Sequence, residues 1–319
     1  MISGGSWRQW IYLSGSLLAA TATPASQIIR VATYNVENYL DAGIAGRPAK
    51  SAAAKARVRE ALHALNPDVV ALQEMGTTNA LEELRASLKA EGLDYPYWDY
   101  LAGAADTNIH IAVLSRLVLT DPCYHTNDAF LLDGRRFRVS RGFLELKVQA
   151  NRAFHFTLIA AHLKSKRAVP QADESDLREQ EGLLLREKVN ARLSEDPGGD
   201  LIVLGDFNDT PNSRVIKTLV GRGRNVLVDT RPGERFAGGA PVSGAQGGSR
   251  PVCWTHYFPE ADAYTRIDYI LLSRALARKL KREETYVLAW PDWGLASDHR
   301  PVIAGFGVRS DERRVGKEC

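Results

Sequence analysis

Cysteines are scarce in this sequence, and no long apolar run follows its first 25 residues. Three cysteines among 319 residues exclude a scaffold held together by many disulfides. No later stretch approaches the ~20 consecutive apolar residues that a membrane-spanning helix needs, so no transmembrane segment is predicted there. Glycine (26) and proline (14) are too few, and hydrophobic residues (45%) too many, for a collagen-like, low-complexity or disordered chain. The sequence is therefore that of a globular protein.

The chain also lacks a strong charge of either sign. Its 41 Lys and Arg residues against 38 Asp and Glu residues give a formal net charge of +3. A protein that holds nucleic acid through bulk charge needs a larger excess of cations. Any anionic partner must therefore be recognised by a local group of residues.

Both ends of the chain look separate from the folded part. Residues 1–25 carry one cation, Arg8, then an apolar stretch and small residues, which predicts a signal peptide and a secreted or periplasmic protein. An uncleaved anchor or a wrongly assigned start codon is the alternative. Residues 309–319, RSDERRVGKEC, resemble translated sequencing-adapter DNA, and the alternative is an ordinary charged tail. Residues 26–308 are predicted to form one domain, in which Cys123 and Cys253 are either a disulfide or two free thiols without metal-ligand spacing.

Hydrophobic periodicity predicts that strands and helices alternate in the first part of the chain and that several strands then follow one another without a helix between them. A 21-residue segment rich in Gly, Pro and Ser, residues 231–251, is predicted to be a surface loop. Since strands outnumber helices, two sheets packed face to face with helices outside are the expected architecture. The expected strands are 28–36, 68–72, 109–114, 137–148, 154–161, 201–204, 267–272 and 302–308, and the expected helices 51–65, 79–90 and 174–193.

Six short motifs lie at the ends of these expected strands, where enzymes collect functional side chains. In chain order they are TYNVEN, LQEM, AHLKSKR, GDFND, RIDYI and SDHRP. Together they resemble the signature set of the endonuclease/exonuclease/phosphatase superfamily, over about residues 28–308. The resemblance implies the deoxyribonuclease I-like fold, a four-layer α/β sandwich with two packed mixed β-sheets flanked by helices. It also implies a metal-dependent phosphoric ester hydrolase.

The chemistry of phosphoester hydrolysis calls for a cation at the phosphoryl oxygens and a base that positions water. Hard oxygen ligands suit Mg²⁺, with Mn²⁺ as its substitute. Glu74 follows a buried apolar strand, and the resemblance implies that it is the principal metal ligand. It also implies that Asn35 supports the metal or its water and that Asp298 is a second metal contact or orients water. The alternatives are a helix-start carboxylate for Glu74 and a strand-terminating residue for Asn35.

The GDFND motif delivers two polar side chains two residues apart. In extended geometry Asp206 and Asn208 point to one side, and Phe207 points away into the core. The resemblance implies that Asp206 orients or deprotonates the attacking water and that Asn208 binds the phosphate or that water. A Gly-Asp turn is the alternative.

Two histidines complete the expected catalytic set. The resemblance pairs Asp268 with His299, and such a carboxylate favours an imidazolium that can donate to a phosphoryl oxygen. His162 matches a family histidine that contacts phosphate or helps the leaving group. Its alternative is a core or surface histidine, and the neighbouring Lys164, Lys166 and Arg167 favour the functional interpretation.

Three further residues are expected to bind substrate. Arg141 resembles a family arginine near the substrate groove, Lys164 belongs to a cationic rim, and Trp254 can stack on a base or sugar. The alternative for Arg141 is a surface arginine on a strand, that for Lys164 is a solvated loop, and that for Trp254 is a packed core aromatic.

The sequence therefore predicts a Mg²⁺- or Mn²⁺-dependent phosphodiesterase or nuclease acting on DNA or RNA by in-line attack of water. A phosphomonoesterase or a sphingomyelinase-like phospholipid phosphodiesterase is the alternative. A binding module that has lost the chemistry is a third interpretation, which the complete set of polar residues disfavours. The expected partner is a phosphoester substrate, and no protein partner can be inferred.

Overall fold

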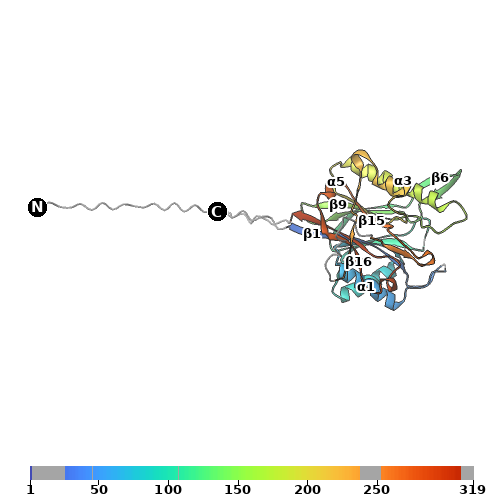
Figure 1. Cartoon of the computed structure of the whole chain (residues 1–319), viewed down its shortest axis with the longest axis horizontal. Helices are drawn as coiled ribbons and strands as arrows, with labels where there is room; N and C mark the ends of the chain where they lie inside the picture. Colours follow the sequence, from blue (N-terminus) through green and yellow to red (C-terminus); the bar gives the residue numbers. More distant parts are fainter. Residues whose placement is uncertain (2–25, 45, 107, 238–252, 310–319) are drawn as a thin grey trace, which may run out of the picture.

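Two large β-sheets lie face to face, and helices cover both outer faces (Figure 1). The computed structural model describes residue 1 and residues 26–44, 46–106, 108–237 and 253–309. The predicted signal peptide and nearly all of the predicted tail lie outside the described residues. The arrangement of the described part confirms the predicted four-layer α/β sandwich.

The first sheet has seven strands and mixed direction. Its centre is β1, which pairs parallel with β2 and antiparallel with β17. Across the sheet the strands are β12 (Gly233–Phe236), β16 (Leu280–Ala289), β17 (Val302–Arg309), β1 (Ser26–Tyr39), β2 (Val69–Met75), β4 (His110–Ser115) and β3 (Tyr97–Leu101).

The second sheet has six strands. β10 lies between β9, with which it runs parallel, and β15, with which it runs antiparallel. Across the sheet the strands are β11 (Val228–Asp229), β15 (Asp268–Leu272), β10 (Leu201–Asp206), β9 (His155–His162), β8 (Phe143–Gln149) and β5 (Val118–His125).

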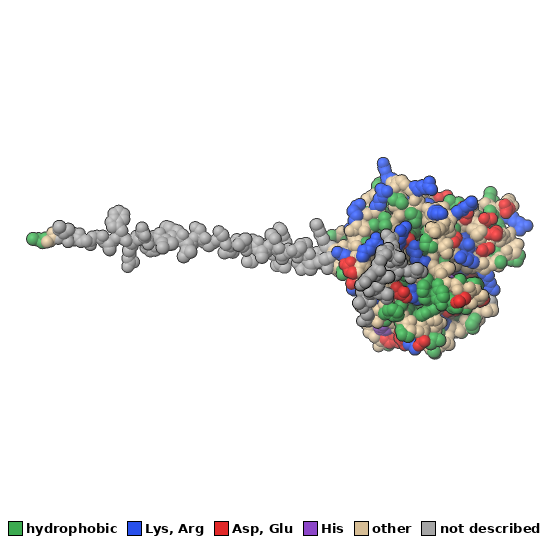
Figure 2. All heavy atoms as spheres, viewed as in Figure 1, with side chains coloured by type: hydrophobic (Ala, Val, Ile, Leu, Met, Phe, Trp, Pro, Cys, Tyr) green, Lys and Arg blue, Asp and Glu red, His purple; other side chains and the backbone are tan. Residues whose placement is uncertain are grey.

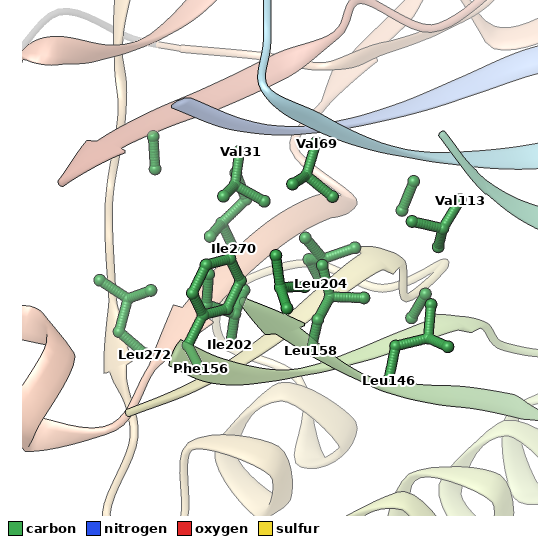
Figure 3. Packing of buried hydrophobic residues seen from close by; sticks show 14 of the residues in the cluster. Val31, Val69, Val113, Leu146, Phe156, Leu158, Ile202, Leu204, Ile270 and Leu272 are labelled. Atoms are coloured by element: carbon green, nitrogen blue, oxygen red, sulfur yellow. The ribbon is translucent and has the colours of Figure 1, made fainter. Parts of the chain in front are cut away.

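The core between the two sheets is made of aliphatic and aromatic side chains. Figure 3 shows Val31, Val69 and Val113 pointing from the first sheet towards Leu158 and Leu204 of the second. All five are fully buried. Because strand side chains alternate between faces, each of these strands presents its other face to a layer of helices.

Helices complete the sandwich on both sides. α1 and α2 bury leucines such as Leu62 and Leu84 against the first sheet, and α3 and α4 bury Leu185 and Leu219 against the second. Ser51 caps α1 by accepting a hydrogen bond from the backbone N–H of Ala54. The helices are α1 (Ala52–Leu65), α2 (Thr78–Ala90), α3 (Glu174–Glu195), α4 (Arg214–Val220) and α5 (Arg274–Ala277), with 3₁₀ turns at Gly223–Asn225, Pro259–Ala261 and Trp293–Leu295.

Two short hairpins stand apart from the large sheets. One is formed by β6 (Ala129–Leu132) and β7 (Arg135–Arg138), and it projects from the body beside α3 (Figure 1). The other is formed by β13 (His256–Phe258) and β14 (Ala263–Thr265). Basic and acidic side chains are interspersed over the face drawn in Figure 2, as the small net charge suggests.

The structure departs from the predicted elements in several places. Residues 137–148 do not form one strand, because the chain turns at Gly142 (φ 77°) between β7 and β8. β16, Leu280–Ala289, was not predicted, because its first half is charged and half exposed and therefore shows no apolar alternation. Part of the predicted loop 231–251 is β12, which gains its hydrogen bonds from the edge of β16 although Pro232 precedes it and Gly233 is its first residue. Residues 238–251 lie outside the described part.

Among the described residues, Cys123 and Cys253 are free thiols, so the structure agrees with the second of the two alternatives for them. Within the same part of the chain no helix combines the length and the apolar character that crossing a bilayer requires.

Gly205 is a position where the fold tolerates no side chain. Its φ is 138°, and a Cβ atom there would lie 1.8 Å from the carbonyl oxygen of Ala161 in β9. Gly205→Ala should therefore lower the free energy of unfolding by about 2–6 kcal/mol, the sum of backbone strain and overpacking. Urea denaturation measures the change. In the control Gly233→Ala the new Cβ meets no atom within 4 Å, so equal stability losses in both variants would contradict the close β9–β10 approach.

Candidate active site

The side chains singled out by the motifs come from strand ends that share one edge of the two sheets. In the first sheet the C-terminal ends of β1 and β2 meet the start of β17, and in the second those of β9 and β10 meet the start of β15. The residues at this edge are Asn35 (β1), Glu74 (β2), His162 (β9), Asp206 (β10), Asp268 (β15) and, just before β17, Asp298 and His299.

Asp206 is the centre of this group. Its Oδ2 accepts hydrogen bonds from Asn35 Nδ2 at 3.0 Å and from Asn208 Nδ2 at 3.3 Å. The Nε2 atoms of His162 and His299 lie 3.4 Å and 3.7 Å from the same oxygen. Since Asn35 and Asp206 belong to different sheets, their hydrogen bond joins the sheets at the site.

The environment of Asp206 tunes its acidity. The residue is 1% exposed, and burial raises the pKa of its carboxyl to about 6, although the positive charge of His299 opposes the shift. The backbone N–H of Asn208 donates to its Oδ1 at 2.9 Å. A carboxyl with a pKa in this range can take up and release a proton near neutral pH.

The GDFND motif is arranged differently from the expected extended strand. β10 ends at Asp206, and Asn208 adopts a left-handed backbone conformation with φ 53°. The turn, and not strand alternation, carries the Asn208 side chain back to Asp206. Phe207 is fully buried and stacks on Tyr269 with ring centroids 5.5 Å apart, so its predicted position in the core is confirmed.

Asp268 and His299 form a buried pair. His299 Nδ1 lies 2.8 Å from Asp268 Oδ2, and the backbone N–H of Asp268 donates to Thr255 Oγ1 at 3.1 Å. Burial opposes a charge on His299, but Asp268 and then Asp206 raise its pKa well above the usual value. The ring is thereby held as an imidazolium whose Nε2–H faces Asp206.

Ser297 holds the loop that carries His299. Its Oγ donates to the backbone carbonyl of Asn35 at 2.8 Å and accepts from the backbone N–H of His299 at 3.0 Å. This hydroxyl therefore ties the SDHRP loop to β1.

His162 is the neutral counterpart of His299. Burial, reinforced by the positive charges of Arg141 and His299, lowers the pKa of His162 well below its usual value. Its Nδ1 atom is buried without a hydrogen-bond partner. The two histidines beside Asp206 Oδ2 thus differ in charge because only His299 has a second carboxylate, that of Asp268.

Glu74 lies where β2 is irregular. Its φ is 60°, and the pairing of β2 shifts register on both sides at this point. Such bulges redirect side chains and are frequent beside active sites. Glu74 Oε2 accepts from the backbone N–H of Asn38 at 3.0 Å and lies 3.7 Å from the guanidinium of Arg47.

Two more carboxylates lie beside Glu74. The backbone N–H of Asp298 donates to Glu37 Oε2 at 3.1 Å, and Lys50 Nζ lies 4.0 Å from the same oxygen. Burial and then the charges of Asp298 and Glu74 raise the pKa of Glu37, while Lys50 lowers it. The three carboxylates therefore repel one another.

A cavity of about 470 Å³, called the cleft below, opens at this edge of the sheets, and Asn35, Glu37 and Asp268 are not among the residues that line it. One side is cationic, with Lys166 and Arg167 from the loop after β9. Another side is apolar and includes Phe258, which is 46% exposed. The residues of the predicted catalytic and metal set that line it are Glu74, His162, Asp206, Asn208, Asp298 and His299.

Two of the three predicted substrate-binding residues support the loop after β9 and do not line this cavity. Arg141 is 5% exposed and donates to the backbone carbonyl of Leu163 at 2.9 Å. Lys164 Nζ donates to the carbonyls of Ser165 and Arg167 at 3.1 and 2.7 Å. Both face a neighbouring hollow of about 510 Å³. Their substrate-binding roles stay predictions.

Trp254 also lies outside the cavity lining. The guanidinium of Arg300 sits 3.6 Å from its ring centroid, and Tyr264 and Trp293 pack edge-on against it. This packing matches the alternative of a packed aromatic, and stacking on a base or sugar stays a prediction.

Sequence reasoning missed His256 and Glu37. His256 lines the cavity, its ring centroid lies 4.6 Å from that of His299, and its Nε2 lies 3.7 Å from Asp298 Oδ2. Against the effect of burial, His256 and His299 lower the pKa of Asp298. Glu37 stands inside the TYNVEN motif and His256 stands two residues after Trp254, so a signal was present for both.

Comparison with known structures gives the same fold. The catalytic domain of human Nocturnin with bound sulfate superimposes with a TM-score of 0.63 at 17% identity, over 90% of this chain and 97% of that one. Sphingomyelinase C from Streptomyces griseocarneus gives 0.58 at 18% identity, over 88% and 99%. A 3'-5' exonuclease from Neisseria meningitidis gives 0.58 at 20% identity, over 87% and 99%.

No curated protein sequence matches the chain significantly. A family profile does match, and it spans residues 32–299, which include the first five motifs and the sixth as far as His299. The family described by this profile acts on phosphoester bonds, in keeping with the polar cleft. The chain therefore belongs to the endonuclease/exonuclease/phosphatase family.

Proposed function

We propose that this protein hydrolyses phosphodiester bonds of DNA or RNA by in-line attack of water and that it requires a divalent cation, Mg²⁺ or Mn²⁺. The observation that carries the proposal is the convergence on Asp206 Oδ2 of two amides and two histidines, all within 3.7 Å. A buried carboxyl with a pKa near neutrality, beside a fixed imidazolium, supplies both a base and a donor.

The residues of the cleft fit a hard divalent cation. Glu37, Glu74 and Asp298 gather negative charge that Lys50 and Arg47 offset only in part. Carboxylate oxygens of this kind are the ligands that Mg²⁺ and Mn²⁺ prefer. Glu74 and Asp298 would hold the ion, and the bound ion supplies positive charge at the phosphoryl oxygens.

Asn35 takes a supporting part in this proposal. Its Nδ2 donates to Asp206 and its Oδ1 accepts from the backbone N–H of Glu37 at 3.0 Å. The amide thus connects the proposed base to the carboxylates beside it.

The other steps of the hydrolysis are assigned to side chains of the protein. Asp206 accepts the proton of the attacking water as the water oxygen bonds to phosphorus, the opposite P–O bond breaks, and the leaving oxygen takes up a proton from solvent. Asn208 and neutral His162 hold the carboxylate in place. His299, kept charged by Asp268, donates to a phosphoryl oxygen whose negative charge grows in the transition state. Lys166 and Arg167 attract the phosphate chain at the rim of the cavity.

The apolar side of the cavity favours a second candidate. Phe258, Ala263 and Ile267 line it, and such a surface accepts either a nucleobase or the apolar part of a phospholipid. The second candidate is therefore a phospholipid phosphodiesterase on the same catalytic centre.

A substrate panel separates the candidates. The purified protein with Mg²⁺ is offered plasmid DNA, RNA, bis-p-nitrophenyl phosphate, p-nitrophenyl phosphate and sphingomyelin, and initial rates are compared. We expect cleavage of nucleic acid and of the diester at rates well above that of the monoester. Turnover of sphingomyelin alone would favour the second candidate, and turnover of the monoester alone would contradict a phosphodiesterase.

A further inference from the structure

A second group of metal-ligating side chains lies away from the cleft, on β5 and β8. Cys123 and His125 stand two residues apart on β5, and Glu145 lies opposite Cys123 on β8. His125 Nε2 is 2.9 Å from Glu145 Oε2. One ligand atom from each of the three residues lies within 4.8 Å of the other two.

A β-bulge brings these three side chains to one face. The pairing of β5 with β8 shifts between Thr120 and Cys123, and Asp121 in the bulge has φ 52°. Without the extra residue Cys123 would pair with Leu144, whose side chain belongs to the core between the sheets. The bulge instead aligns Cys123 with Glu145, on the face covered by α3.

This face is the opposite side of the sheet from the cleft. Glu145 pairs with Ile159 of β9, and Ile159 and Ala161 belong to the cluster that packs against α3. His162, the next residue after Ala161, points to the other face and approaches Asp206. The sheet therefore separates the two groups.

The burial and charge of Glu145 suit a metal ligand. The residue is 3% exposed, and its Oε1 forms an ion pair with the guanidinium of Arg192 from α3. Arg192 pairs with Oε1 of Glu145, whereas Oε2 faces His125 and the space between Cys123, His125 and Glu145.

The types of metal-binding side chain distinguish Cys123, His125 and Glu145 from the residues of the cleft. A thiolate, an imidazole and a carboxylate are the three ligand types that bind Zn²⁺ in proteins, and a thiolate is a poor ligand for Mg²⁺. Cys123 and His125 are half-buried, which leaves an approach for the ion and a position for a fourth ligand from solvent.

We propose that Cys123, His125 and Glu145 form a mononuclear Zn²⁺ site that joins β5 to β8. The two cysteines of the domain have no metal-ligand spacing between themselves. The site arises from the Cys-x-His pair on one bulged strand and a carboxylate on its neighbour.

The test measures metal binding to the full chain without any assay of hydrolysis, so its result is independent of the proposed function. Protein stripped with EDTA is titrated with Zn²⁺ and, separately, with Co²⁺, whose sulfur-to-cobalt absorption reports only on a site that contains a thiolate and not on the cleft. The variants are Cys123→Ser and, as a matched control, Cys253→Ser, and Cys319 is kept in both. Circular dichroism verifies that each variant is folded.

We expect wild type and Cys253→Ser to bind Zn²⁺ with equal affinity and to show a sulfur-to-cobalt charge-transfer absorption with Co²⁺. Cys123→Ser should lose that absorption and bind Zn²⁺ at least about tenfold more weakly. Glu145→Gln should weaken binding but keep the absorption, because the thiolate stays. A wild type without the absorption, or a Cys123→Ser variant with unchanged Zn²⁺ affinity, would overturn the site and leave the group as an ion-pair anchor for α3.

Discussion

Replacing Asp206 by asparagine should lower kcat for phosphodiester hydrolysis by about 10²–10⁴-fold, the range seen when a general base is removed. The amide keeps the shape of the side chain, but it cannot take a proton from water. Initial rates on bis-p-nitrophenyl phosphate at saturating Mg²⁺ measure the loss. Asp200→Asn is the matched control, because Asp200 precedes the other end of β10 and pairs with Lys279 at 2.7 Å. A wild-type rate in Asp206→Asn would remove Asp206 from the mechanism.

The pH dependence of the wild type follows from the same carboxyl. Since burial raises the pKa of Asp206 to about 6, the basic form is lost as pH falls through that value. We expect kcat/KM to decrease about tenfold per pH unit on the acid side. A rate that stays constant from pH 7 to well below 5 would contradict a base with this pKa.

Replacing His299 by alanine should lower kcat by about 10²–10³-fold, as expected for the loss of one preorganised donor. The imidazolium is 4% exposed and fixed by its 2.8 Å contact with Asp268, so water cannot take its place with the same geometry. His63→Ala is the control, because His63 lies on α1 and contacts Glu91 at 3.1 Å. Equal rates for His299→Ala and wild type would show that no donor acts there.

Asp268→Asn tests how His299 is kept charged. The carboxylate raises the pKa of His299, so the imidazolium persists above the ordinary pKa of histidine and is lost as pH rises through the raised value. The variant should shift that loss to lower pH by about 1–3 units. An NMR titration of the His299 ring gives the shift directly, and the alkaline limb of kcat should move with it.

Much of the site could be predicted because each motif follows a buried apolar strand. The apolar runs LIVLG before Asp206 and DVVALQ before Glu74 predict both a buried strand and the position where it ends. Functional side chains are expected at such strand ends. The pairing of Asp268 with His299 followed from the family resemblance, and the structure brings the two side chains to 2.8 Å.

The parts that escaped prediction depend on backbone geometry and long-range pairing. The left-handed conformations of Glu74 and Asn208 decide where their side chains point, and neither residue type reveals them. His256 reaches the cleft through an isolated bridge to His299, 43 positions later in the chain. The bulge that aligns Cys123 with Glu145 has only Pro122 as a sequence signal, and proline has many other uses.

The Mg²⁺ dependence of hydrolysis in wild type and Glu74→Gln tests most directly whether these side chains converge around a divalent ion. We expect no turnover after EDTA treatment, recovery on addition of Mg²⁺ or Mn²⁺, and a Glu74→Gln variant that needs at least about tenfold more metal for half-maximal rate. Full activity in EDTA, or identical metal titrations for the two proteins, would contradict that convergence.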